Sequence, residues 1–125
     1  MKNLRFTHKI VVPNTKETVD NTDGYFEELS DVKVFTLSQE EFDDLRKDGG
    51  LFDAVDEAFG TIIDDCEEDR IESIQVPQAI SIVEEFFEKG DSAVASGLQT
   101  VHQSLKYAEE RGVFWEIING AELYE

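Results

Sequence analysis

The acidic block between Glu17 and Glu72 is the feature that most constrains this chain. It holds 20 Asp and Glu against four Lys and Arg, and it supplies most of the formal net charge of −18 on 125 residues. Carboxylates at this density repel one another, so a fold must spread them over a solvated surface. The resulting potential attracts cations and basic proteins and repels nucleic acid. We therefore expect no nucleic-acid partner.

Large apolar side chains accompany this charge. The chain is 40% hydrophobic and contains nine Phe and one Trp, whereas disordered acidic tails lack such residues. A chain of this length buries roughly two thirds of its unfolded surface, which suffices for one core, so we expect a single domain over residues 1–125. No stretch approaches the roughly 20 apolar residues of a membrane span, and no signal-peptide pattern occurs. We expect a soluble, cytoplasmic protein.

The first 16 residues are the only basic part of the chain. They contain four Lys and Arg and no acid, so we expect this segment to pack against the acidic body. Apolar residues alternate along it with polar ones, which predicts a strand with one buried face that ends at Pro13: Leu4, Phe6, His8, Ile10 and Val12. An edge strand with Lys and Arg on its wet face is a compatible interpretation.

A second strand, Val32 to Leu37, leads into the clearest local signal in the chain. Ser38 and Glu41 stand in the capping-box relation, and Leu37 and Phe42 occupy the positions of a hydrophobic staple. We therefore predict a helix that begins at Ser38 and stops at the pair Gly49 and Gly50.

Helical spacing of apolar residues predicts three more helices. The first runs from Leu51 to Gly60, and the second has Pro77 in its first turn and ends at Gly90. The third begins near Asp91 or Ser92, spans about 20 residues and ends at Gly112. One helical turn is also expected at Tyr25 to Ser30.

The remaining apolar segments predict strands. Thr61 to Ile63 and Ile71 to Val76 flank an acidic run and form either a hairpin or one interrupted segment. Val113 to Ile118 reads as a central strand covered on both faces, and Asn119 and Gly120 indicate a tight turn after it. Together these elements predict an α+β fold with a mixed or antiparallel sheet of four or five strands and about four helices mainly on one face.

Five carboxylates crowd into six residues after Ile63: Asp64, Asp65, Glu67, Glu68 and Asp69. Hard cations bind several oxygens at once, but this run has no recognisable ligand register, and a solvated turn or strand exterior is the simpler interpretation. A calcium loop from Val19 to Ser30, with Gly24 at its sixth position, is excluded because Val19 and Ser30 occupy the first and last ligand positions, which require acidic residues. We predict no metal and no other cofactor.

No motif identifies a catalytic chemistry. His8 and His102 are the only histidines, and although each could join a carboxylate in acid and base catalysis, no spacing pattern unites them. The lone Cys66 stands among anions that disfavour its thiolate. Phosphate loops, paired-cysteine zinc patterns and nucleophile elbows are absent. We expect a protein that is not an enzyme.

Charge alone therefore guides the functional hypothesis: a non-enzymatic acidic binding protein, in the form of an inhibitor or immunity-type protein that masks a basic, nuclease-like partner. Eight acidic residues form the predicted binding face: Glu40, Asp43, Asp44, Asp64, Asp65, Glu67, Glu68 and Asp69. One alternative is a structural or regulatory subunit that uses an apolar patch. Another is a metal-binding protein or small enzyme whose carboxylates and a histidine converge in one pocket.

Overall fold

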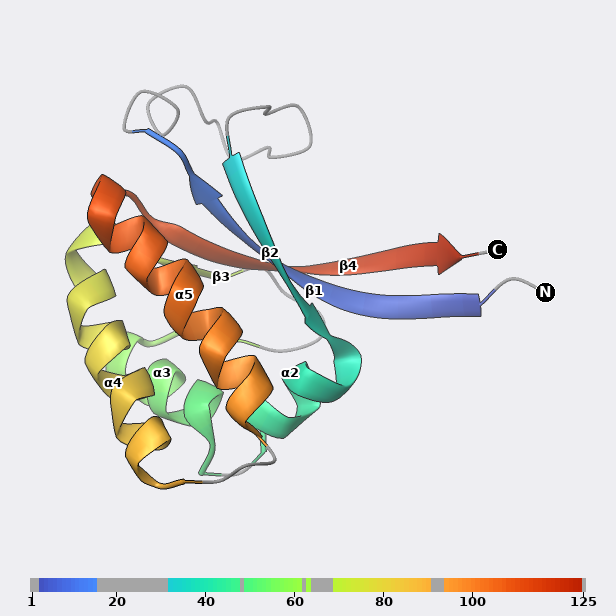
Figure 1. Ribbon diagram of the computed structural model, residues 1–125, viewed down its shortest axis with the longest axis horizontal. Helices are drawn as coiled ribbons and strands as arrows, with labels where there is room; N and C mark the ends of the chain where they lie inside the picture. The colour runs from blue at the N-terminus through green and yellow to red at the C-terminus, as the bar shows by residue number, and fades with distance from the viewer. Residues whose placement is uncertain are drawn as a thin grey trace.

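The computed structural model describes residues 3–15, 32–47, 49–61, 63, 69–90 and 94–124, and of residues 3–7, 69 and 119–124 it describes the backbone only. The elements are β1 (Asn3–Pro13), β2 (Val32–Ser38), α2 (Gln39–Leu45), α3 (Leu51–Phe59), β3 (Asp69–Ile71), the 3₁₀ turn η1 (Ser73–Gln75), α4 (Val76–Glu88), α5 (Ala95–Arg111) and β4 (Trp115–Tyr124). Figure 1 shows these helices gathered on one side of the sheet. The predicted α+β class is confirmed.

The described sheet has four strands in the order β2-β1-β4-β3, and every neighbouring pair is antiparallel. β1 pairs on both sides, so the interpretation of this strand as an edge is wrong. Its alternation explains why it lies inside the sheet: His8, Ile10 and Val12 are almost fully buried. Val11 points to the opposite face of the sheet and is also buried, so this part of β1 is covered on both faces.

β4 is longer than predicted, and the turn expected at Asn119 and Gly120 is wrong. The strand continues to Tyr124, because β1 supplies a partner at every step: Thr7 lies opposite Gly120, and Asn3 lies opposite Tyr124. A continuous ladder of backbone hydrogen bonds outweighs a local turn preference. Beyond β2 and β3 the two strands run on as a two-stranded ribbon that leads to both ends of the chain (Figure 1).

The predicted helix signals are confirmed where they rest on local chemistry. The Ser38 hydroxyl accepts from the Glu41 amide at 3.1 Å, and the Ser38 amide donates to Glu41 Oε1 at 2.9 Å. Gly60 and Gly112 end α3 and α5 with φ of 73° and 66°, values that favour glycine. α2 ends at Leu45, short of the glycine pair.

The segment around the acidic run departs from the prediction. Ile71 ends a strand of three residues that pairs with β4, and Glu72 and Gln75 then form a capping box that begins η1. A strand to Val76 is therefore wrong, since these polar side chains turn the backbone toward α4. Neither Thr61 nor Ile63 lies in a strand.

Two expectations extend beyond the described residues. The helical turn at Tyr25 to Ser30 lies outside them altogether. α5 spans 17 residues from Ala95, and the predicted start at Asp91 or Ser92 lies outside the described range. Among the described residues, no helix combines the length and apolar character that crossing a membrane requires.

One hydrophobic core joins the sheet to the helices. The His8 ring stacks on Phe42 with centroids 3.6 Å apart and an angle of 9°, and Phe42 also lies 5.2 Å from the Phe52 ring. On α5, the Ser104 hydroxyl accepts from Trp115 Nε1 at 2.7 Å. These contacts lock α2, α3 and α5 to the central strands.

The other face of the sheet carries a partly buried ion pair. Arg70 Nε lies 2.8 Å from Glu116 Oε1, and its guanidinium lies 3.8 Å from the centre of the Phe114 ring. Glu116 and Phe114 are buried. The pair links β3 to β4 at a position where sequence reasoning expected only apolar packing.

Candidate acidic docking site

α2 concentrates carboxylates on one short helix. Phe42 and Leu45 are buried and fix the inner face of α2 to the core. Glu40 and Asp43 are exposed, and because they are three residues apart they share one side of the helix. The core packing of α2 therefore holds two of the predicted binding residues in a fixed relation on the surface.

Glu41 serves the fold and not the surface. Its Oε1 accepts from the Ser38 amide, and its Oε2 accepts from the Ser96 hydroxyl of α5 at 2.5 Å. Partial burial raises the pKa of Glu41, but the hydrogen bonds from Ser38 and Ser96 outweigh it and hold this pKa below its ordinary value. Glu41 therefore stays ionised as a cap for α2 and a link to α5.

Among the described residues, the other carboxylates of α2 bond only within the helix and to the residues that follow it. Asp44 Oδ1 pairs with Lys47 Nζ at 3.2 Å, and Asp43 Oδ1 accepts from the Gln39 side chain at 2.8 Å. Within the described part of the chain, Glu40 makes no ion pair or side-chain hydrogen bond. Glu41 is thus the acid of α2 that binds another element of the fold, whereas Glu40 and Asp43 are exposed and Asp44 is half-buried.

The second half of the predicted binding face is not placed. Asp64, Asp65, Glu67 and Glu68 lie outside the described residues. Asp69 begins β3, where its backbone pairs with Ile117. The structure therefore brings Glu40, Asp43 and Asp44 together on α2 and leaves the acidic run between Ile63 and β3 as a sequence-based prediction.

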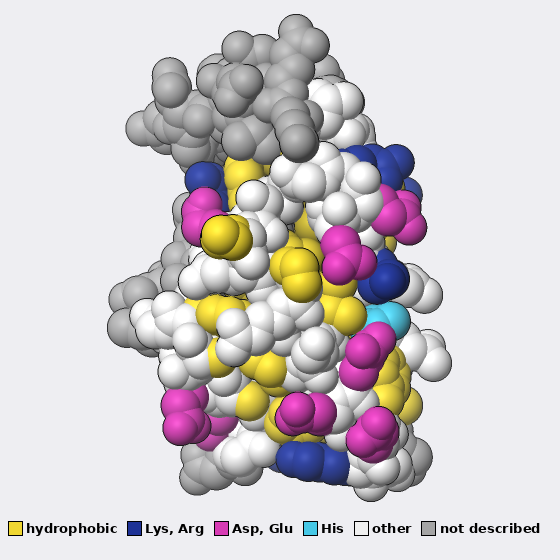
Figure 2. Space-filling model, turned by 90° about the vertical axis from the view of Figure 1, so that its left-hand side faces the viewer, with side chains coloured by type: hydrophobic (Ala, Val, Ile, Leu, Met, Phe, Trp, Pro, Cys, Tyr) yellow, Lys and Arg dark blue, Asp and Glu magenta, His cyan; other side chains and the backbone are white. Residues whose placement is uncertain are grey.

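Elsewhere in the described chain, some acids also bond to the fold and others are exposed. Asp56 Oδ1 accepts from the Thr61 hydroxyl at 2.6 Å and from the Ile63 amide at 3.0 Å, so it fixes the backbone after α3. Glu57, Glu85 and Glu88 are exposed and have no such bond to the described residues. Figure 2 shows the molecule from the side on which α4 lies, where acidic side chains lie among polar and hydrophobic ones.

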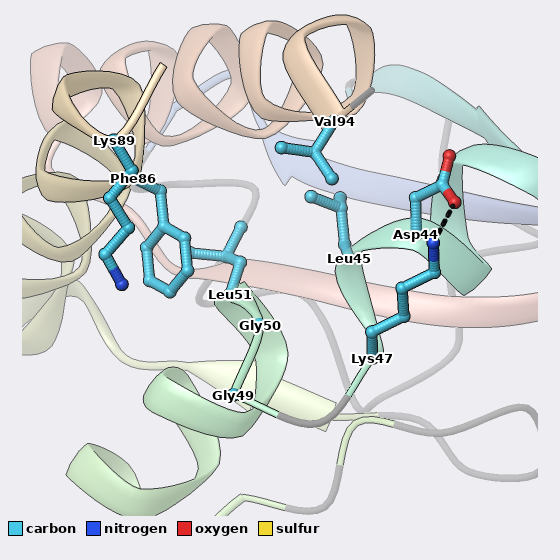
Figure 3. Close-up of a pocket in the computed structure, with 9 residues that line it drawn as sticks. All are labelled: Asp44, Leu45, Lys47, Gly49, Gly50, Leu51, Phe86, Lys89 and Val94. Atoms are coloured by element: carbon cyan, nitrogen blue, oxygen red, sulfur yellow. Dashed lines mark ion pairs between the residues drawn. The ribbon is translucent and has the colours of Figure 1, made fainter. Parts of the chain in front are cut away.

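A pocket of about 250 Å³ adjoins the C-terminal end of α2. It lies where the ends of four helices meet, and Figure 3 shows its lining: Asp44, Leu45, Lys47, Gly49, Gly50, Leu51, Phe86, Lys89 and Val94. Apolar side chains from α2, α3 and α4 and the residue before α5 form its walls. The charged residues among the described lining are the paired Asp44 and Lys47, together with Lys89, whose ammonium lies 4.1 Å from the centre of the Phe86 ring.

Sequence reasoning missed this pocket because its walls come from stretches about 40 positions apart. One signal for it was present in the glycine pair. A Cβ on Gly50 would lie 2.8 Å from the carbonyl oxygens of Leu45 and Lys47, and Gly49 has φ of 74°. Both positions therefore require glycine, and the tight backbone there shapes the pocket floor.

The two histidines lie apart from this pocket. His8 is buried in the core against Phe42, whereas His102 lies on α5, with its Nε2 3.3 Å from Glu84 Oε2 and its ring 5.4 Å from that of Phe87. Among the described residues, no group of three or more His, Cys, Asp or Glu is arranged to hold a metal ion. The described geometry therefore offers a charged helix and an apolar pocket as its candidate site.

Comparison of the chain with protein-family models, with curated proteins and with solved structures finds no match. What the protein binds is therefore inferred from its own residues.

Proposed function

We propose that this protein is a non-enzymatic binding protein that docks α2 onto a basic surface of a partner protein. An inhibitor or immunity-type protein that masks a nuclease-like cleft is the concrete form, because carboxylates can occupy a site built for phosphates. The observation that carries the proposal is that different residues of α2 stabilise the fold and face the solvent. Glu41 caps the helix, Phe42 and Leu45 anchor it, and Glu40 and Asp43 remain exposed.

Exposed acids that do not serve the fold have a cost. In a chain with net charge −18, each additional carboxylate on a rigid helix raises the self-repulsion of the folded state. A basic partner relieves that repulsion and is steered toward it by the same field. The acidic run from Asp64 to Asp69 belongs to the same proposal as an extension of the docking face.

A subunit that binds through an apolar patch would need contiguous exposed hydrophobic area. In the described part of the chain, the exposed large hydrophobic residues are Val34, Ile74 and Phe87. They belong to β2, η1 and α4, so they come from three separate elements. On the face in Figure 2, hydrophobic side chains are separated by acidic side chains and by the surface of other side chains and backbone. These observations favour the acidic helix as the docking surface.

Two variants of equal charge test the proposal. The docking variant carries Glu40→Gln, Asp43→Asn and Asp44→Asn, and the control variant carries Glu57→Gln, Glu85→Gln and Glu88→Gln. The probe is an eleven-residue lysine peptide with a central alanine, and its association rate is measured by stopped flow. At low salt we expect the docking variant to associate about fivefold more slowly than wild type, and the control by less than twofold.

Salt provides the second readout. The difference between the two variants should largely vanish at about 0.5 M NaCl, because screening removes the steering field at the separations involved. Equal slowing of both variants would mean that the peptide responds to net charge alone. In that case α2 is not a docking surface.

A further inference from the structure

The pocket is continuous with the proposed docking helix. Asp44 and Leu45 both line the pocket and belong to α2, so a partner that covers Glu40 and Asp43 would lie beside the pocket opening. We propose that this pocket receives one neutral aromatic side chain of the basic partner. The proposal rests on the function proposed above. Charge attraction would bring the partner to α2, and the aromatic side chain in the pocket would then slow its dissociation.

The size and the walls of the pocket suit a single aromatic ring. A cavity of about 150 Å³ lined by aliphatic and aromatic side chains accepts benzene, and the pocket here measures about 250 Å³. It is smaller than the pockets of about 300 Å³ or more that hold drug-sized ligands. Figure 3 shows the side chains of Leu51 and Phe86 on one side and those of Leu45 and Val94 on the other. One phenyl group would contact both walls.

The pocket is largely formed before a partner arrives. Leu45 and Leu51 are each 1% exposed, so the core holds them in place. The Gly50 amide donates to the Lys47 carbonyl at 2.7 Å, and the Gly49 amide donates to Asp53 Oδ2 at 2.8 Å. A preformed pocket requires little ordering upon binding. Buried aromatic anchors in such pockets carry much of the binding energy in protein interfaces.

The charges of the lining select a neutral anchor over a cationic one. Among the described lining residues, Asp44 and Lys47 pair with each other, which leaves the ammonium group of Lys89. A Lys or Arg side chain of the partner would be repelled by the Lys89 ammonium group, whereas a phenyl ring could replace water against the apolar walls. The basic residues of the partner would then lie over Glu40 and Asp43, on the solvent side of α2.

A pair of peptides tests the anchor. The first is the lysine peptide with central alanine, and the second differs only in a central phenylalanine. We expect the phenylalanine peptide to bind about tenfold more tightly, chiefly through slower dissociation. In NMR spectra of the wild-type complex we expect nuclear Overhauser effects between its ring protons and the methyl groups of Leu45, Leu51 and Val94.

A matched pair of variants locates the anchor. Val94→Phe should fill the pocket and abolish the preference for the phenylalanine peptide without weakening the alanine peptide. Val34→Phe makes the same change on β2 and should leave the preference intact. The methyl contacts are measured on the wild-type protein, so they test the proposal even if Val94→Phe impairs folding.

The outcomes separate the two proposals. Equal affinities for the two peptides, absent ring contacts, or a preference that survives in Val94→Phe would overturn the anchor pocket. In each of these cases the acidic docking surface would stand if the charge variants still differ. Conversely, if the alanine peptide does not distinguish the two charge variants, the docking proposal fails even where the pocket binds phenylalanine.

Discussion

At the scale of single residues, the Ser104 hydroxyl provides the acceptor that the buried Trp115 indole needs. It is fully buried on α5, accepts from the Trp115 indole at 2.7 Å and donates to the Val101 carbonyl at 2.7 Å. A large indole can be buried at the centre of this core because its N–H has a partner there.

We predict that Ser104→Ala destabilises the protein by about 1 to 3 kcal/mol, because it leaves the buried indole N–H without an acceptor. Ser81→Ala is the control, since Ser81 is an exposed serine on α4 that donates to the Pro77 carbonyl at 3.3 Å. Urea unfolding followed by circular dichroism measures both. Equal losses for the two variants would show that the indole has found another acceptor.

This residue also marks a limit of sequence reasoning. The spacing of Leu98, Val101 and Leu105 correctly predicts the buried stripe of α5, because periodicity reports which side of a helix meets the core. The stripe does not identify Ser104 as buried. The hydroxyl of Ser104 can be buried because it binds the Trp115 indole. Trp115 begins β4, after α5 has ended, so the helical pattern of α5 does not include it.

At the scale of elements, the start of α2 depends on an ionised side chain. The pKa of Glu41 is lowered in the fold by its hydrogen bonds with Ser38 and Ser96, which outweigh the effect of burial. A lowered folded-state pKa stabilises the protein above the pKa of the unfolded chain, and this contribution is lost as the pH falls through the folded value.

We therefore predict that Glu41→Gln costs about 0.5 kcal/mol at pH 7, since glutamine keeps the capping geometry without the charge. The difference from wild type should shrink as the pH falls below about 4, where the wild-type carboxylate is also neutralised. Glu40→Gln is the control, since Glu40 is exposed and makes no cap. Urea unfolding at several pH values measures both, and a cost of Glu41→Gln that does not change with pH would contradict this account.

The elements also show why local signals succeed in one place and fail in another. The capping box at Ser38 and Glu41 is confirmed because all its partners lie within four positions. Asn119 and Gly120 favour a turn locally, but they lie opposite His8 and Thr7 of β1. Pairing over more than 100 positions decided the outcome, and a strand pattern read in isolation contains no information about it.

At the scale of the whole molecule, acid crowding should govern the response to salt. The chain carries 29 acids against 11 Lys and Arg. Some acids of the described residues lie in ion pairs, such as Glu109 with Lys106 and Glu116 with Arg70. Others, such as Glu57, Glu85 and Glu88, are exposed and form no ion pair with a described residue. The folded surface therefore keeps unscreened repulsion.

We predict that the melting temperature rises between low salt and about 0.15 M NaCl, because screening at that ionic strength acts beyond roughly 8 Å. The triple variant Glu57→Gln, Glu85→Gln and Glu88→Gln should show a smaller rise, because it removes part of the repulsion. Thermal unfolding followed by circular dichroism decides the matter. An unchanged melting temperature in the wild type would mean that the charges are already compensated.

The candidate site was only partly accessible from sequence. Composition pointed to an acidic face, and the capping box correctly placed the helix that carries Glu40, Asp43 and Asp44. The pocket beside them was out of reach, because its walls meet only when α4 and α5 fold back over the turn at Gly49 and Gly50. Tertiary packing decides which helix ends lie together, and a local sequence pattern does not show this.

The long pairing of β1 with β4 has a mechanical consequence. Asn3 lies opposite Tyr124, so both ends of the described chain lie at the same end of one ladder (Figure 1). In an antiparallel pair the hydrogen bonds run perpendicular to the strands, and a force that separates these ends would pull along the bonds, opening them one pair at a time. Tethered by these ends, the ribbon would unzip at low force before the pull reaches the strands that hold the core.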